Sequence, residues 1–139
     1  MSISVVYWSG TGNTQAMAEA VAEGIKAAGQ EAELLEVGDA DAKTVAEEAA
    51  FALGCPAMGA EVLEESEMEP FVEELESYVS GKKILLFGSY GWGDGEWMRN
   101  WEESCKEAGA NLVCDSVICQ EEPDDEATDA CKALGAALV

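Results

Sequence analysis

The chain has 139 residues, 48% of them hydrophobic, which predicts one folded domain over residues 1–139 rather than a disordered segment. Seven basic residues against 29 acidic ones give a formal net charge of −22, so nucleic acid and anionic membrane surfaces are excluded as partners. No apolar run approaches the ~20 residues of a membrane span, and no basic segment precedes the first apolar run. We therefore expect a cytoplasmic protein without a signal peptide.

Apolar, strand-like runs alternate with helical patterns along the chain. Strands are predicted at 3–8, 31–37, 49–54, 83–89 and 110–120. Helices are predicted at 13–28, 41–48, 97–108 and 127–138. A further helix is predicted to start at the capping-box pair Ser66 and Glu69, to continue through Tyr78 and Val79, and to end at Gly81. This alternation is typical of a doubly wound α/β fold, in which helices cover both faces of a parallel sheet.

Three glycine-containing segments follow predicted strands one, three and four: SGTGNT at 9–14, GCPAMGAE at 54–61 and SYGWGDGEW at 89–97. Ligands of open parallel sheets bind beyond the carboxyl ends of the strands, so we expect the three segments to meet in one site. The acidic stretch 121–126 is interpreted as a solvated loop and the start of the last helix.

The first segment is predicted to bind a terminal phosphate. It lacks the lysine of a phosphate-binding Walker A loop, and Gln15 stands where a dinucleotide fingerprint needs its third glycine. Backbone amides at the N-terminus of a helix can hold a dianion, and the hydroxyls of Ser9, Thr11 and Thr14 add donors. An ordinary strand–helix turn is the simpler alternative.

The other two segments offer flat or polarisable side chains. Met58 and Trp92 each follow a strand within a glycine-containing loop, where they could hold a planar ring between a thioether and an indole. Either residue alone could instead be a loop side chain packed on the domain. Together with the phosphate-binding segment, they indicate a planar ligand that carries a phosphate.

The five cysteines and the lack of histidine limit the remaining chemistry. No two cysteines form a CxxC pair, so zinc and iron–sulfur sites have almost no support, and each cysteine is most simply a small buried hydrophobe. A receiver domain needs acidic residues after the first strand, and a low-molecular-weight phosphatase needs a CxxxxxR motif; the chain has neither. A pure interaction module would leave the three glycine-containing segments unexplained.

The motifs VVYWSGTGNT, LGCPAMGAEVLEE and FGSYGWGDGEWM resemble the three flavin-binding loops of flavodoxins, specifically the short-chain type of anaerobic bacteria. The resemblance covers the whole chain in order and spacing. It implies a three-layer flavodoxin-like sandwich with a five-stranded parallel sheet in the order 2-1-3-4-5. It also implies non-covalently bound FMN as the cofactor.

By this resemblance the 5′-phosphate would lie on residues 9–14 near Ser89, and the isoalloxazine ring would lie between Met58 and Trp92. Glu61 would accept a hydrogen bond from the flavin N3–H. Ala60 stands at a position where many members of the family have a polar or acidic residue. The implied cofactor contacts are Ser9, Gly10, Thr11, Gly12, Asn13, Thr14, Pro56, Ala57, Met58, Gly59, Ala60, Glu61, Ser89, Tyr90, Gly91, Trp92, Gly93, Asp94, Gly95, Cys119 and Gln120.

The implied function is low-potential one-electron transfer, with FMN moving between semiquinone and hydroquinone. No catalytic residue and no metal are expected, and the Gly59–Ala60 peptide would flip on reduction. Partners would be redox enzymes that otherwise use ferredoxin and that dock through basic surfaces, and we expect a monomer. The alternative is an FMN-dependent NAD(P)H/quinone oxidoreductase, although no loop offers cations for a pyridine nucleotide.

A lysine placed in the first segment should ease reduction of the bound flavin. Thr11→Lys puts a positive charge beside the predicted phosphate site, and every ~1.4 kcal/mol of relieved repulsion raises a one-electron potential by about 59 mV. We expect the second reduction potential to rise by tens of millivolts in a potentiometric titration. An unchanged second potential in a variant that still binds FMN would contradict this electrostatic account.

Overall fold

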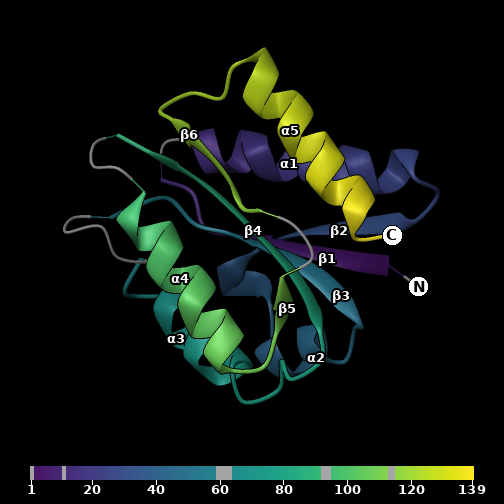
Figure 1. Ribbon diagram of the computed structural model, residues 1–139, viewed down its shortest axis with the longest axis vertical. Coiled ribbons are helices and arrows are strands. Elements are labelled where there is room, and N and C mark those ends of the chain that lie inside the picture. Colours follow the sequence, from purple (N-terminus) through teal and green to yellow (C-terminus); the bar gives the residue numbers. More distant parts are fainter. Residues whose placement is uncertain (1, 11, 59–63, 92–94, 113–114) are drawn as a thin grey trace.

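The computed structural model describes residues 2–10, 12–58, 64–91, 95–112 and 115–139 (Figure 1). Its strands are β1 (Ser2–Tyr7), β2 (Glu31–Glu36), β3 (Ala50–Gly54), β4 (Lys83–Tyr90), β5 (Asn111–Leu112) and β6 (Val117–Gln120). Its helices are α1 (Asn13–Ala27), α2 (Ala42–Ala46), α3 (Met68–Leu75), α4 (Glu96–Glu107) and α5 (Asp125–Ala137), with a short 3₁₀ helix, η1, at Val37–Asp39.

The strands form one parallel sheet in the order β2-β1-β3-β4-β5, which confirms the predicted order 2-1-3-4-5. The predicted fifth strand consists of two segments that share one place beside β4. Lys83 of β4 pairs with Asn111, and Phe87, four residues later in β4, pairs with Val117, which is six residues after Asn111. The strand opposite β4 therefore has two more residues than β4 over this stretch, so the run at 110–120 does not form one continuous ladder.

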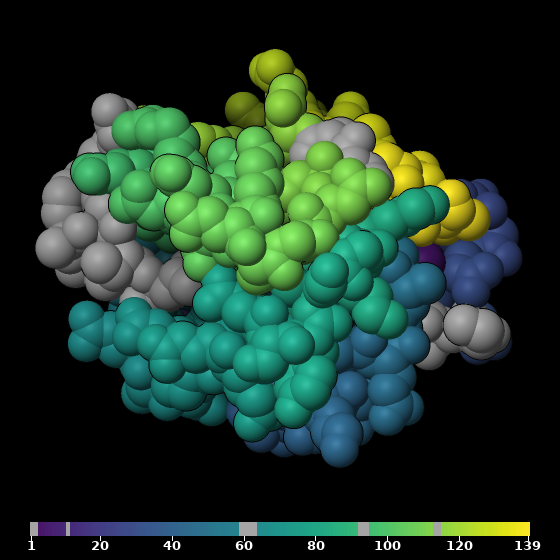
Figure 2. All heavy atoms as spheres, turned by 60° about the horizontal axis from the view of Figure 1, so that its bottom comes forward, coloured from purple at the N-terminus to yellow at the C-terminus, as the bar shows by residue number. Residues whose placement is uncertain are grey.

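Two apolar cores lie on opposite faces of the sheet and form a three-layer molecule (Figure 1). Helices α1 and α5 cover one face, where Val5, Met17 and Cys131 have no exposed surface. Helices α2, α3 and α4 cover the other, where Phe51 and Met68 are equally buried. In Figure 2, α4 (green) lies beside the teal segment that includes α3, and the Ser104 hydroxyl of α4 donates to the Glu76 carboxylate at the end of α3.

The third helix differs from its prediction at both ends. Its N-cap residue is Glu67, which makes no side-chain capping bond, so the capping box predicted for Ser66 and Glu69 is wrong. The Glu64 carboxylate takes that role, because a charged acceptor competes better than the Ser66 hydroxyl for the amides of this turn. Bonds from the amides of Ser77 and Tyr78 to the carbonyls three residues earlier tighten the end of the helix.

Tyr78 therefore lies beyond α3 and is 44% exposed, although the sequence places it on the helix's apolar face. No helix within the described ranges has both the length and the apolar composition needed to cross a membrane.

Helices α1 and α5 cross at a pair of glycines. A β-carbon at Gly24 of α1 would fall on the Lys132 carbonyl oxygen of α5, and one at Gly135 of α5 would fall on the Val21 carbonyl oxygen of α1. Each glycine thus admits the backbone of the other helix, and a salt bridge of 3.6 Å between Lys132 and Glu23 borders the crossing. The crossing matters for the site because α1 begins in the predicted phosphate-binding segment.

Gly24→Ala should destabilise the protein, although alanine is favoured over glycine by about 1 kcal/mol in an open helix. Because the added methyl group meets backbone atoms on the other helix, we expect a loss of about 1–3 kcal/mol in the free energy of unfolding, measured by urea denaturation of the apoprotein. Gly135→Ala should act in the same direction. A stabilised Gly24→Ala variant would show that the two helices can separate at no cost.

Candidate functional site

A concave feature, which we call the edge cavity, lies beyond the carboxyl ends of the strands. Its volume is about 580 Å³, within the range of pockets that bind small ligands. Its lining residues are Trp8, Gly10, Asn13, Pro56, Ala57, Met58, Ser89, Tyr90, Gly91, Glu121 and Glu122. Parallel pairing of β1 with β3 and of β3 with β4 brings their carboxyl ends to this edge. The predicted convergence of the three glycine-containing segments is therefore present in the structure.

The first segment forms a tight turn before α1. Gly12 has the left-handed φ of 96° and is the N-cap of α1, where it supplies no capping side chain. Its N–H donates to the Ser9 hydroxyl over 3.0 Å, which fixes the turn. The turn directs the positive end of the α1 dipole toward this edge of the sheet, as an anion site requires. Thr11 lies outside the described residues.

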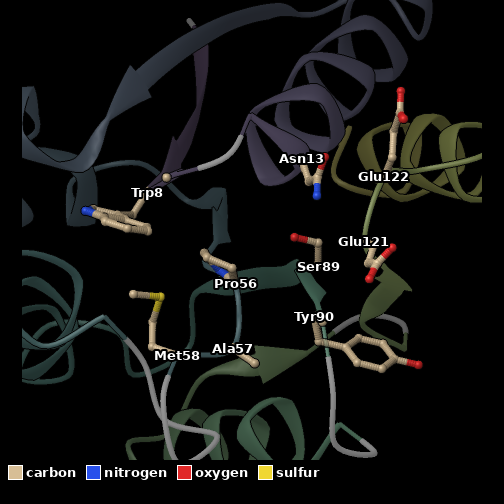
Figure 3. Close-up of a pocket in the computed structure, with 11 residues that line it drawn as sticks. Trp8, Asn13, Pro56, Ala57, Met58, Ser89, Tyr90, Glu121 and Glu122 are labelled. Carbon is tan, nitrogen blue, oxygen red and sulfur yellow. The ribbon is translucent and has the colours of Figure 1, made fainter.

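Two buried hydroxyls join the first segment to the third. The oxygens of Thr14 and Ser89 are 3.1 Å apart, and these residues are 1% and 4% exposed. In Figure 3 the Ser89 hydroxyl points toward the space between Trp8 and Asn13. The Thr14–Ser89 contact therefore holds the start of α1 against the end of β4 and presents a hydroxyl to the edge cavity.

The second segment is held by backbone bonds on the β4 side. The amide of Cys55 donates to the Phe87 carbonyl over 3.1 Å, and that of Ala57 donates to the Ser89 carbonyl over 3.0 Å. The indole N–H of Trp97 donates to the Cys55 carbonyl over 3.1 Å. These bonds extend the β3–β4 pairing past the end of β3 and place Pro56, Ala57 and Met58 along the cavity.

Three lining residues were missed by the sequence prediction. Trp8 lies opposite Ser89 across the cavity, beside Met58. Glu121 lies near Ser89 and Tyr90, and Glu122 lies on the side of Asn13 (Figure 3). In the sequence, only their positions indicate that they could line the site: Trp8 directly precedes SGTGNT, and the two glutamates directly follow Gln120. The acidic stretch 121–126 is the predicted exposed loop and start of the last helix, and its first two residues also line the cavity.

Glu121 has an unusual backbone conformation. Among the described residues other than glycine it alone has a positive φ, 59°. Its N–H donates to the Tyr90 carbonyl over 2.7 Å, and the Gln120 side-chain amide donates to the Gly91 carbonyl over 3.4 Å. The left-handed turn at Glu121 therefore closes the end of β6 onto the end of β4.

The other predicted contacts lie around the cavity or outside the described residues. Ser9, Gly12, Thr14, Gly95, Cys119 and Gln120 are described but do not line it. Gly59, Ala60, Glu61, Trp92, Gly93 and Asp94 lie outside the described residues, as does the predicted peptide flip at Gly59. The described predictions that line the cavity are Gly10, Asn13, Pro56, Ala57, Met58, Ser89, Tyr90 and Gly91.

The charge around the cavity is negative. Among the described residues, the charged ones that line it are the carboxylates Glu121 and Glu122, and no lysine or arginine is among them. A second hollow of about 300 Å³ on the other side of Trp8 is lined by Glu36, Asp39 and Glu67. Burial, and after it the carboxylates of Glu36, Glu19 and Asp39, raise the pKa of the adjacent Tyr7.

The cysteines take no part in metal binding within the described ranges. The four described cysteines are free thiols, and no group of three potential metal ligands was found there; Cys114 lies outside the described residues. Burial raises the pKa of Cys55, Cys105 and Cys131 to about 12, so these thiols stay protonated and pack as small apolar groups. Cys119 is half-buried, with its sulfur 3.5 Å from that of Met17.

The site is that of a doubly wound protein that binds a planar ligand carrying a phosphate. A helix N-terminus and hydroxyls lie at one end of the edge cavity, and apolar and thioether groups lie at the other. This donor set fits FMN, because the phosphate can be held by amides and hydroxyls while the flat ring contacts apolar surface.

Comparisons with known proteins agree with this class. Residues 5–135 match the family model described as Flavodoxin. The chain is 50% identical over 127 residues to a flavodoxin of Clostridium beijerinckii, covering 91% of this chain and 92% of the relative. It is 45% identical over 135 residues to a flavodoxin of Megasphaera elsdenii, covering 97% and 96%.

Solved structures give the same result. The solution structure of the two-electron-reduced Megasphaera elsdenii flavodoxin superposes with a TM-score of 0.89 at 46% identity, covering 99% of this chain and 98% of that one. A flavodoxin from the domain Archaea gives a TM-score of 0.87 at 31% identity, covering 99% and 96%.

The chain belongs to the flavodoxin family, and it is of the short-chain type. It is an FMN-binding electron carrier, and like other flavodoxins it acts through redox partner proteins rather than as an enzyme on a substrate of its own. These relatives do not favour the alternative of an NAD(P)H/quinone oxidoreductase.

Glu121→Gly should stabilise the apoprotein. A residue other than glycine loses about 1–2 kcal/mol in the left-handed region, whereas glycine adopts it freely. We expect a gain of about 1 kcal/mol in the free energy of unfolding, measured by urea denaturation. Glu122→Gly is the matched control: it removes the same charge from a residue without a positive φ and should destabilise by about 0.5–1 kcal/mol. Equal effects of both substitutions would show that the backbone at Glu121 is not strained.

Proposed function

We propose that this chain is a low-potential electron carrier that holds FMN in the edge cavity, with the phosphate at the turn before α1 and the ring toward Met58. The observation that carries this proposal is that three strand ends meet around one cavity with hydroxyls and a helix N-terminus beside it. No lysine or arginine stands among its described lining residues. Bound FMN supplies the one-electron chemistry. The chain binds and orients it and sets its electrostatic surroundings.

The phosphate end would be held by fixed donors. The Ser9 hydroxyl accepts from the Gly12 amide, and the Thr14 hydroxyl contacts that of Ser89, so these bonds fix the turn. Preorganised amides and hydroxyls do not have to reorient on binding, which favours affinity. Thr11 is proposed to add a donor from outside the described residues.

The ring end would lie along apolar surface. Pro56, Ala57 and Met58 form one wall and Trp8 lies next to Met58 (Figure 3). These side chains exclude water from one part of the ring and offer it dispersion contacts. Trp92 and Glu61 remain predicted ring contacts, and both lie outside the described residues.

The negative surroundings support a low reduction potential. Glu121 and Glu122 line the cavity, and an added electron places further negative charge near them and near the phosphate. At ~4 Å two unit charges repel by about 4 kcal/mol at an effective dielectric constant of ~20, and screening weakens charges beyond ~8 Å. Groups on the cavity wall therefore matter more than most of the −22 net charge.

The same charges suit partners with basic docking surfaces. Trp8 lines both the edge cavity and the acidic hollow at Glu36, Asp39 and Glu67. Both hollows that share this indole are therefore lined by carboxylates. A partner that presents lysine or arginine there would be attracted and oriented over the cavity. We propose a cytoplasmic monomer that does not bind nucleic acid or membranes.

Ser89→Ala should weaken FMN binding about tenfold. The substitution removes a hydroxyl directed into the cavity, and it leaves the buried Thr14 hydroxyl without its hydrogen-bond partner. The measurement is calorimetric titration of apoprotein with FMN. Ser116→Ala is the matched control, since Ser116 donates to Glu102 over 2.8 Å and does not line the edge cavity; its Kd should stay within twofold of the unsubstituted protein.

Equal affinity in Ser89→Ala and the unsubstituted protein would contradict this location of the cofactor. Sustained oxidation of NADH by the FMN-loaded protein would contradict its assignment as a carrier without substrate turnover.

A further inference from the structure

Glu64 is a buried carboxylate that gathers several donors. It is 4% exposed, and its Oε1 accepts from the amides of Glu67 over 2.6 Å and Met68 over 3.2 Å. Its Oε2 accepts from the Ser66 amide over 3.1 Å and also from the Ser66 hydroxyl. Burial raises the pKa of Glu64, but these hydrogen bonds outweigh it and leave the pKa below its ordinary value. The side chain is therefore an ionised cap at the start of α3.

The backbone of Glu64 is tied to the wall of the edge cavity. Its N–H donates to the Cys55 sulfur over 3.4 Å, and its carbonyl accepts from the Glu69 amide over 2.8 Å. Cys55 directly precedes Pro56, Ala57 and Met58, and it is itself held by Phe87 and Trp97. Glu64 thus connects the chain at the base of this cavity wall to the first turn of α3.

We propose that Glu64 is a positioning residue for the flavin: through its carboxylate it fixes the start of α3, and through its amide it fixes Cys55 and the segment that carries Met58. This inference rests on the proposed location of FMN in the edge cavity. Glu64 does not line that cavity, so it would act through the segment from Cys55 to Met58 and not by contact.

Glu64→Gln tests the carboxylate with little change in size. Glutamine accepts through one oxygen only, so its NH₂ group would face either the amides of Glu67 and Met68 or the amide of Ser66, which are themselves donors. The substitution therefore loses either both bonds on the Glu67–Met68 side or the amide bond on the Ser66 side, and it weakens the cap.

Glu48→Gln is the matched control. The Glu48 carboxylate likewise accepts from a backbone amide and a serine hydroxyl, those of Ser4, over 2.7 Å and 2.5 Å. Ser4 lies in the amino-terminal half of β1, whereas the cavity lies beyond the carboxyl end of that strand. The control therefore removes comparable hydrogen bonds at a distance from the proposed flavin site.

The experiment uses full-length apoprotein titrated with FMN by calorimetry, at a temperature where urea denaturation shows each variant to be folded. It is followed by a potentiometric titration of the reconstituted protein. We expect the Kd of Glu64→Gln for oxidised FMN to rise at least tenfold, and the ratio of its Kd values for oxidised and fully reduced FMN to change at least threefold. Glu48→Gln should change both by less than twofold, even where it lowers stability as much.

Ser66→Ala provides a milder variant, because it removes only the hydroxyl bond to Glu64. If Glu64→Gln does not fold, Ser66→Ala should still raise the Kd about twofold to fivefold. Unchanged affinity and unchanged potentials in folded Glu64→Gln, or equal shifts in Glu48→Gln, would overturn the positioning role while leaving the Ser89 result intact. A Ser89→Ala variant with normal affinity would instead remove the proposed location of FMN on which this inference depends.

Discussion

Parallel pairing among β1, β3 and β4 is the constraint on which the site depends. Three segments that are far apart in sequence become neighbours only because their strands run in the same direction and end at the same edge. The pairing continues past the strands themselves: the amides of Cys55 and Ala57 bond to β4, and the Thr14 hydroxyl bonds to that of Ser89. The segments that line the edge cavity are therefore held by hydrogen bonds to the sheet, and their positions are fixed as closely as those of the strands.

The electrostatic character of the proposed site follows from the donors that it offers to an anion. Main-chain amides, a helix N-terminus and neutral hydroxyls can hold a phosphate without bringing a positive charge to it. A lysine-based site would offset the charge of a bound phosphate, whereas the edge cavity is lined by the carboxylates Glu121 and Glu122. A protein with such a site binds a negatively charged cofactor and at the same time resists further negative charge on it. That combination suits a carrier that gives electrons up readily.

Some features of the fold and site were predictable from local patterns, and others were not. The strand–helix alternation predicted a parallel sheet with helices on both faces because it depends on short-range periodicity, whereas the order of the strands came from the resemblance of the three motifs to flavodoxins. The capping box at Ser66 failed because its spacing does not exclude a stronger acceptor nearby, and Glu64 is buried only once α3 packs on the sheet. The division of the last strand into β5 and β6 likewise depends on its register with β4, which the apolar run at 110–120 does not specify.

The sequence by itself determined the fold class, the three segments and the chemistry they share, because hydrophobic periodicity and glycine positions act within a few residues. Only the tertiary structure decided which side chains form the cavity wall. Trp8, Glu121 and Glu122 became lining residues through strand ends and a left-handed turn that bonds to Tyr90, and Thr14 became a buried partner of Ser89. These contacts join residues from separate strands and helices, so their distances are set by packing and register, which no local pattern contains.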